Sequence, residues 1–167
     1  MSVRDIDTPW GSHKDSLAAA LAKLDPGALV IEHGAGMYSS PLIARYDVRV
    51  ICIEELPGWT GWACWLYSSA GRQIETLERA KLAVPHLASA ALVFIDGAAR
   101  ERGDLLKWSL DAGAPLILCH DTESDHRSMY GYAGHYFERR GYTMTDDSAR
   151  TTSESWRPTT TTWRRNP

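Results

Sequence analysis

The chain has 167 residues, of which 44% are hydrophobic and 23% charged, which suits one compact domain over 1–167 and leaves no room for a second. A net charge of -3 gives no overall attraction to polyanions, so we expect no nucleic-acid partner. The chain has no apolar run long enough for a bilayer, and MSVRDID lacks the order of a secretory signal, so we expect a cytoplasmic protein without a membrane partner. Cys52, Cys64 and Cys119 follow no metal-binding spacing and are expected to be buried free thiols.

The first part of the chain predicts a helix, a strand and a short helix. Strong helix formers at 16–24 predict the first helix, which Asp25-Pro26-Gly27 should end. The apolar run 28–32 predicts the first strand. Ser39-Ser40-Pro41 is typical of a cap followed by a proline in the first turn, so a short helix should follow over 42–45.

The middle of the chain continues this alternation. An apolar run predicts a second strand at 48–53, and a helix should follow at 59–69. The stretch 72–76 is interpreted as a short strand, although its period also fits a helix. A further strand is predicted at 91–95, followed by a helix at 105–110 that Gly113 should end.

The last part predicts one more buried strand and an edge. The run 115–119 is apolar, and a helix at 127–140 should follow it. Two threonine-rich pieces, 142–146 and 159–164, suit an antiparallel pair at a sheet edge, joined by a polar, mobile linker at 147–158. Strands that alternate with helices predict an α/β fold with a mostly parallel sheet covered by helices.

The first strand ends in the stretch IEHGAGMYSS. In an open α/β sheet, ligands bind beyond the carboxyl ends of the strands. Gly34 and Gly36 lie at that end, where the absence of a Cβ lets the backbone approach a ligand closely. A tight strand-to-helix turn without a ligand is the alternative.

The second strand ends at Glu54 and Glu55. A carboxylate at this position can accept hydrogen bonds from both hydroxyls of a ribose. A solvated loop is the alternative. The third glycine of a dinucleotide fingerprint is absent, because Ser39 stands there, and Glu32 would place an anion near a pyrophosphate. These features favour a nucleoside that carries an ammonium group, such as S-adenosylmethionine.

Several motifs, in order, resemble those of class I S-adenosylmethionine-dependent methyltransferases over 9–141. IEHGAGMYSSPLIA resembles the first motif of a small branch of that family, E-x-G-x-G-x-x-S-T/S, and VICIEELPGW, LVFIDGAAR, LILCHDTE and TPWGSHKDSL resemble later and earlier elements. The resemblance implies a Rossmann-like, doubly wound sheet with an antiparallel C-terminal edge and helices on both faces. It also implies S-adenosylmethionine as cofactor, with Glu54 rather than Glu55 on the ribose and Trp59 near the adenine. The cofactor-binding residues expected are Glu32, Gly34, Ala35, Gly36, Ser39, Glu54, Glu55, Trp59, Asp96 and His13.

The catalytic residues should follow the fourth and fifth parallel strands. Asp96 and His120-Asp121 end apolar strands and should emerge on the same rim as Gly34 and Glu54. The sulfonium already activates the methyl group, so the protein has to align the acceptor and remove its proton, and His120 can act as that base. A structural His120-Asp121 pair that caps loop amides is the alternative.

A divalent cation on Asp96, Asp121 and Glu123 is a further alternative. Thr122 follows Asp121 where the catechol type of this family has an asparagine, so we assign no metal ligands from the sequence.

Other conspicuous residues have competing interpretations. Trp59, Trp62 and Trp65 recur at helical spacing, which is more typical of a core, with Trp59 as the exception. His13 could reach the cofactor carboxylate or cap the first helix. Arg100 could bind an acidic acceptor or pair with Asp96. His126, Tyr130 and Tyr132 could line an acceptor pocket or lie on the surface.

The function expected from these features is O-methylation of a hydroxyl-bearing small molecule or sugar, the partner that we expect to bind. A nicotinamide-dependent oxidoreductase and a non-catalytic S-adenosylmethionine-binding module are the alternatives. Little sequence remains for a substrate lid, which favours an open site or a contribution from a second subunit, so a homo-oligomer is compatible with the sequence.

Overall fold

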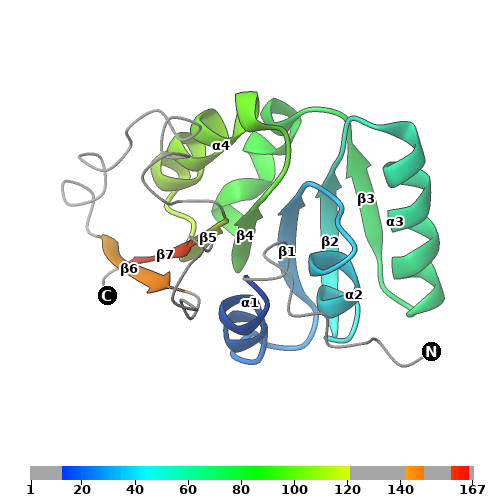
Figure 1. Cartoon of the computed structure of the whole chain (residues 1–167), viewed down its shortest axis with the longest axis horizontal. Helices are drawn as coiled ribbons and strands as arrows, with labels where there is room; N and C mark the ends of the chain where they lie inside the picture. The colour runs from blue at the N-terminus through cyan, green and yellow to red at the C-terminus, as the bar shows by residue number, and fades with distance from the viewer. Residues whose placement is uncertain (1–12, 121–141, 149–158, 166–167) are drawn as a thin grey trace, which may run out of the picture.

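The computed structural model describes residues 13–120, 142–148 and 159–165, and Figure 1 shows a central sheet with helices packed against it. The strands of the sheet are β1 (Ala28–His33), β2 (Val48–Ile53), β3 (Ile74–Leu77), β4 (Leu92–Ile95), β5 (Leu116–Cys119), β6 (Tyr142–Ser148) and β7 (Thr159–Arg165). The helices are α1 (Lys14–Leu21), α2 (Ser39–Ile43), α3 (Pro57–Ser69), the 3-10 helix η2 (Ala80–Ser89) and α4 (Ala99–Ala112).

The sheet has seven strands in the order β3-β2-β1-β4-β5-β7-β6. The first five strands pair in parallel, β7 pairs antiparallel with β5, and β6 pairs antiparallel with β7. The predicted parallel sheet with an antiparallel C-terminal edge is therefore confirmed. The strand order reverses between β1 and β4, which is where ligands bind in folds of this kind.

Each face of the sheet has its own core, because successive side chains of a strand point to opposite faces. Leu29 and Ile31 of β1 pack on one side with residues of η2 and α4. Val30, between them, packs on the other side with residues of α1, α2 and α3. The predicted helices on both faces of the sheet are therefore confirmed.

Three helical segments differ from the prediction. Helix α4 begins at Ala99 rather than at 105, because its first turns are polar and give no apolar signal. The 3-10 helix η2 was not predicted, since Pro85 lies inside it and removes a backbone donor. The first helix ends at Leu21 rather than at 24, where the backbone changes to tighter i to i−3 hydrogen bonds.

The structure corrects several further predictions, and others concern residues outside the described part of the chain. Strand β6 extends to Ser148, so residues 147 and 148 do not belong to a linker. The predicted helix at 127–140 and the rest of the linker lie outside the described residues. Trp65 is 64% exposed, so it is not a core residue as its spacing suggested. The three cysteines are free as expected, although Cys64 is only half-buried.

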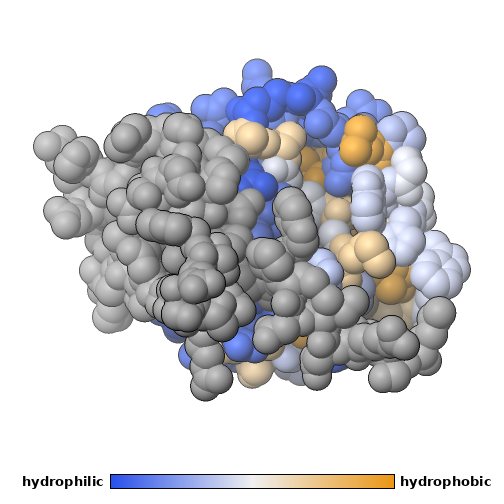
Figure 2. Space-filling model, in the orientation of Figure 1, coloured by the Kyte–Doolittle hydropathy of each residue, from blue (hydrophilic) through white to orange (hydrophobic). Residues whose placement is uncertain are grey.

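The visible surface does not point to a single apolar contact face. Figure 2 shows hydrophobic residues scattered among hydrophilic ones over the part of this face that is coloured. Among the described residues, none of the helices has the length and apolar character that a bilayer crossing requires.

Candidate active site

The residue that follows each inner parallel strand is tied to the end of a neighbouring strand. Backbone N–H groups donate across the sheet from Gly34 to Ile53 (2.9 Å), from Glu54 to Leu77 (2.9 Å), from Asp96 to His33 (2.9 Å) and from His120 to Ile95 (3.0 Å). These bonds bring the four predicted site residues to one rim, as expected. Asp121, the remaining predicted catalytic residue, lies outside the described residues.

The glycine turn after β1 is packed against the turn after β4. Gly34 has a φ of 91°, and a Cβ at this position would lie 2.5 Å from the Cα of Gly97. Both the backbone conformation and the contact therefore require glycine. The turn exposes main chain at the rim, which is the surface that the sequence assigned to a ligand.

Glu32 lies beneath this turn rather than in the cleft. It is 0% exposed, and its two carboxylate oxygens accept hydrogen bonds from Ser40 Oγ (2.8 Å) and Tyr67 OH (2.7 Å). Ser40 Oγ also accepts the N–H of Gly36 at 3.0 Å. Glu32 thus supports the turn through Ser40 and does not itself line the cleft. Its contribution to the predicted cofactor site is therefore indirect.

Burial raises the pKa of Glu32 to about 7, against the opposing hydrogen bonds from Tyr67 and the nearby serines.

The predicted serine cap of the short helix is wrong, because α2 has no side-chain cap and Ser40 binds Gly36 and Glu32 instead. Ser39, which is 1% exposed, lines a cavity in the cleft.

Two neighbouring cavities lie at the rim and share Ala35, Gly36, Trp59 and Asp96. The first, which we call the acidic cavity, has a volume of about 250 Å³. Five carboxylates line it: Glu54, Glu55, Glu78, Asp96 and Glu101. The second, which we call the outer cavity, has a volume of about 290 Å³ and is lined by His13, Met37, Tyr38 and Ser39 in addition to the shared residues.

Glu54 is the carboxylate that faces the glycine turn. Its Oε2 accepts the N–H of Ala35 at 3.1 Å, and its Oε1 accepts the N–H of Leu56 at 2.9 Å. Each oxygen has a further lone pair for a ligand hydroxyl. The carboxylate is therefore held against the glycine turn, in the wall of the acidic cavity.

Glu55 points to arginines instead. It forms ion pairs with Arg100 and with Arg79, the latter at 3.8 Å, and Arg79 also lies 3.5 Å from Glu101. Arg100 thus pairs with Glu55 and not with Asp96, which corrects one of its two sequence-based interpretations. The difference between the two glutamates agrees with the assignment of Glu54 to a ligand.

His33 is the buried neighbour of Glu101 in the acidic cavity. Its Nε2 lies 3.8 Å from Glu101 Oε2, and burial lowers the pKa of His33 to about 4. The ring is therefore neutral near pH 7, so the pair has no ionic component there.

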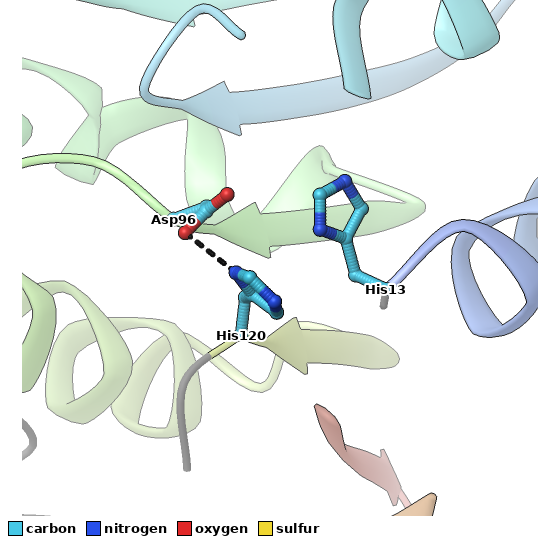
Figure 3. A group of neighbouring side chains, drawn as sticks. All are labelled: His13, Asp96 and His120. Carbon is cyan, nitrogen blue, oxygen red and sulfur yellow. Dashed lines mark hydrogen bonds and ion pairs between the residues drawn. The ribbon is translucent and has the colours of Figure 1, made fainter. Parts of the chain in front are cut away.

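Asp96 and His120, both predicted to be catalytic, lie beside each other at the rim. His120 Nδ1 and Asp96 Oδ1 lie 3.0 Å apart, and His120 is 2% exposed. The ring of His13 lies edge-on to that of His120, with centroids 4.6 Å apart, and Figure 3 shows the three side chains converging from α1, β4 and β5. His13 is the N-cap residue of α1 but makes no side-chain cap, so its capping alternative is wrong.

Arg102 holds the two strand ends together. Its guanidinium donates to the carbonyl oxygens of Gly97 (2.8 Å), Asp96 (3.0 Å) and His120 (3.3 Å), and it pairs with Asp96 Oδ1 at 3.2 Å. This arginine is 7% exposed and was missed in the sequence, where Arg100 drew attention. The signal that could have identified Arg102 is a charged residue on the buried face of the helix that follows the LVFIDGAAR motif.

Comparison with known proteins identifies the fold. No protein-family model matches the sequence, and no curated protein matches it. An rRNA methylase from Streptococcus thermophilus aligns with a TM-score of 0.72 and 14% identity over 97% of this chain and 99% of its own. The precorrin-6y C5,15-methyltransferase of Geobacter metallireducens GS-15 aligns with a TM-score of 0.64 and 18% identity over 92% and 87%. An O-methyltransferase from Bacillus cereus, in complex with SAH (S-adenosylhomocysteine), aligns with a TM-score of 0.66 and 14% identity over 98% and 84%.

The chain has the fold of class I S-adenosylmethionine-dependent methyltransferases. The methyl acceptors named for these proteins differ, and identities this low carry the fold alone. Within this methyltransferase fold, the acidic cavity lies at the switch point of the sheet, and Trp59 lies at the start of α3 with 37% of its surface exposed. Trp59 therefore lines the cleft, as its exceptional place in the tryptophan series suggested.

Proposed function

We propose that this chain is an S-adenosylmethionine-dependent methyltransferase that acts on a hydroxyl group of a small molecule or sugar. The observation that carries the proposal is that the Glu54 carboxylate and the bare main chain at Gly34 and Gly36 lie side by side in the wall of the acidic cavity. A ribose would place its hydroxyls on Glu54, and the methionine part would lie over the glycine turn. The SAH complex of the Bacillus cereus O-methyltransferase, which has the same fold, supports this choice of cofactor.

The charge of the acidic cavity argues against a nicotinamide dinucleotide. Asp96, Glu55 and Glu101 face arginines, but Glu54 accepts only backbone N–H groups among the contacts of the described residues. A carboxylate at this position also binds the ribose of a dinucleotide, but Ser39 replaces the third glycine of the dinucleotide fingerprint, which argues more strongly against such a cofactor. A sulfonium and an ammonium are attracted to a cavity of this sign.

The acceptor side is supported by the Asp96–His120 pair. Asp96 can fix the tautomer and orientation of the His120 ring through Nδ1, so that Nε2 is the nitrogen available to take a proton. The outer cavity shares Asp96 with the acidic cavity, so an acceptor hydroxyl there would lie beside the donor methyl. Its volume, about 290 Å³, suits a small acceptor or one group of a larger one.

Glu54→Ala is the variant that tests the cofactor site. We expect its affinity for S-adenosylhomocysteine, measured by titration calorimetry, to fall by about 10- to 150-fold, since hydrogen bonds to a charged group contribute roughly 1.5–3 kcal/mol. Glu75→Ala removes an exposed carboxylate of β3 that does not line either cavity and should bind as the wild type does.

Wild-type protein that fails to bind S-adenosylhomocysteine at high micromolar concentration would refute the proposal. A rise in NADH fluorescence on mixing would favour the nicotinamide alternative. Cofactor binding without methyl transfer to a broad panel of hydroxyl acceptors would favour the non-catalytic module.

A further inference from the structure

His13, Asp96 and His120 form a cluster of three possible metal ligands. The methyl-transfer proposal uses Asp96 and His120 but gives His13 no role. One ligand atom from each residue, two imidazole nitrogens and a carboxylate oxygen, lies within 4.8 Å of the other two. The two histidines are 1% and 2% exposed, so the nitrogens are removed from bulk water. His13 and Asp96 also line the outer cavity, so the cluster borders the cleft.

The spacing is close to that of a metal site. Bonds of about 2.1 Å to nitrogen or oxygen place neighbouring ligand atoms of a tetrahedral ion about 3.4 Å apart. The three atoms therefore need to approach by up to about 1.4 Å, which is within the reach of side-chain rotation. Asp96 has an oxygen left for this role, because its two side-chain contacts described above both use Oδ1.

The donor atoms select the kind of ion. Mg²⁺ and Ca²⁺ prefer oxygen ligands, whereas two imidazoles suit Zn²⁺ and the other late first-row ions. Arg102, whose guanidinium lies 3.2 Å from Asp96 Oδ1, lowers the attraction of the carboxylate for any cation. The two imidazole nitrogens then provide most of the affinity, which again favours a nitrogen-binding ion over Mg²⁺.

We propose that His13, Asp96 and His120 bind one late first-row divalent cation, such as Zn²⁺, at the wall of the outer cavity. Three protein ligands leave a coordination position open to the cavity, where an oxygen of the acceptor can bind. This site differs from the carboxylate set Asp96, Asp121 and Glu123 considered from the sequence, because two of its three ligands are imidazoles. One of these, His13, lies at the start of α1. With an ion bound, His120 would be a ligand rather than the base, and the ion would lower the pKa of an acceptor hydroxyl that binds to it. This use in methyl transfer rests on the proposed function, but ion binding itself does not.

Titration of the metal-free, full-length protein with Zn²⁺ by calorimetry tests the site. We expect saturable binding of one ion, and no saturable binding of Mg²⁺ over the same range. Co²⁺ should give the visible absorption of a nitrogen-coordinated ion and should be displaced by Zn²⁺. His13→Ala and His120→Ala should each weaken Zn²⁺ binding by at least about 100-fold, since even outer partners of metal ligands matter by about 10- to 100-fold.

Two further variants keep the test interpretable. His13→Phe retains an aromatic ring beside Phe94, whose centroid lies 5.0 Å from that of His13, but removes the ligand nitrogen, and it should also lose Zn²⁺ binding. His86→Ala removes a half-buried histidine of η2, outside the cluster, and should bind Zn²⁺ as the wild type does.

Absence of saturable Zn²⁺ binding by the wild type, or unchanged binding by His13→Phe and His13→Ala, would overturn this proposal. S-adenosylhomocysteine affinity is measured on the same samples. Wild-type protein that binds Zn²⁺ but not S-adenosylhomocysteine would refute the proposed function and leave the metal site standing. Wild-type protein that binds S-adenosylhomocysteine but not Zn²⁺ would refute only the metal site.

Discussion

Gly34→Ala is expected to lower the free energy of unfolding by about 3–5 kcal/mol, since a strained backbone and an overpacked contact each contribute about 1–3 kcal/mol. A Cβ at Gly34 would lie 2.5 Å from Gly97 Cα and 2.7 Å from Gly97 N, and both are backbone atoms that cannot rotate away. The φ of 91° adds strain for any residue with a side chain. Urea unfolding followed by circular dichroism measures the change.

Gly61→Ala is the matched control for this variant. Gly61 lies within α3, and a Cβ there would meet nothing within 4 Å. Alanine is the better helix former, so this variant should be as stable as the wild type or more stable by up to about 1 kcal/mol. If Gly34→Ala unfolds at the same urea concentration as Gly61→Ala, the close packing of the two turns is wrong.

Glu32→Gln is expected to change how stability depends on pH, with an effect of about 3 kcal/mol. Burial raises the pKa of Glu32 from 4.5 to about 7 in the folded protein. Between these values the folded state keeps a proton that the unfolded state has lost, so wild-type stability falls as pH rises from 4.5 to 7 and is level above that. Glutamine does not titrate, so the stability of the variant relative to the wild type should rise across this window.

The difference between the two proteins, rather than either profile, isolates Glu32. His33 has a pKa lowered from 6.5 to about 4, so it contributes a rise in stability with pH over 4 to 6.5, opposite in sign to Glu32. This contribution is the same in both proteins and cancels in the difference. Urea unfolding at pH 4.5 to 8 measures it, with Glu75→Gln as the exposed control on β3. Parallel profiles for Glu32→Gln and the wild type would contradict the buried, protonated state of Glu32.

Sequence periodicity predicted the sheet because its strands are short, apolar and bounded by turn residues. The runs that became β1, β2, β4 and β5 are buried on both faces, so they stand out from the helices between them. Helix α4 was predicted too short, because its early buried positions include Arg102, whose charge hides the helical pattern. Its burial depends on carbonyls at the ends of β4 and β5, which are distant in sequence.

Site residues could be predicted where the chemistry of the ligand requires a particular residue type at a strand end. They could not be predicted where their role depends on contacts with residues distant in sequence. Gly34 and Glu54 could be placed at the strand ends from the sequence, because the chemistry of a nucleoside site needs those residue types there. The role of Glu32 could not be predicted, since it depends on Tyr67, which is 35 residues away along the chain. Likewise, nothing in the local sequence brings His13 beside His120.

The anchoring of Arg102 in α4 has a consequence for how this protein can vary. One guanidinium holds the carbonyl ends of both β4 and β5, so a tilt of α4 carries the two ends together. The spacing between Asp96 and His120 should then survive shifts of that helix. Substitutions on the solvent-exposed side of α4 would then leave the geometry of the Asp96–His120 pair unchanged. The outer surface of this helix is therefore free to diverge in sequence.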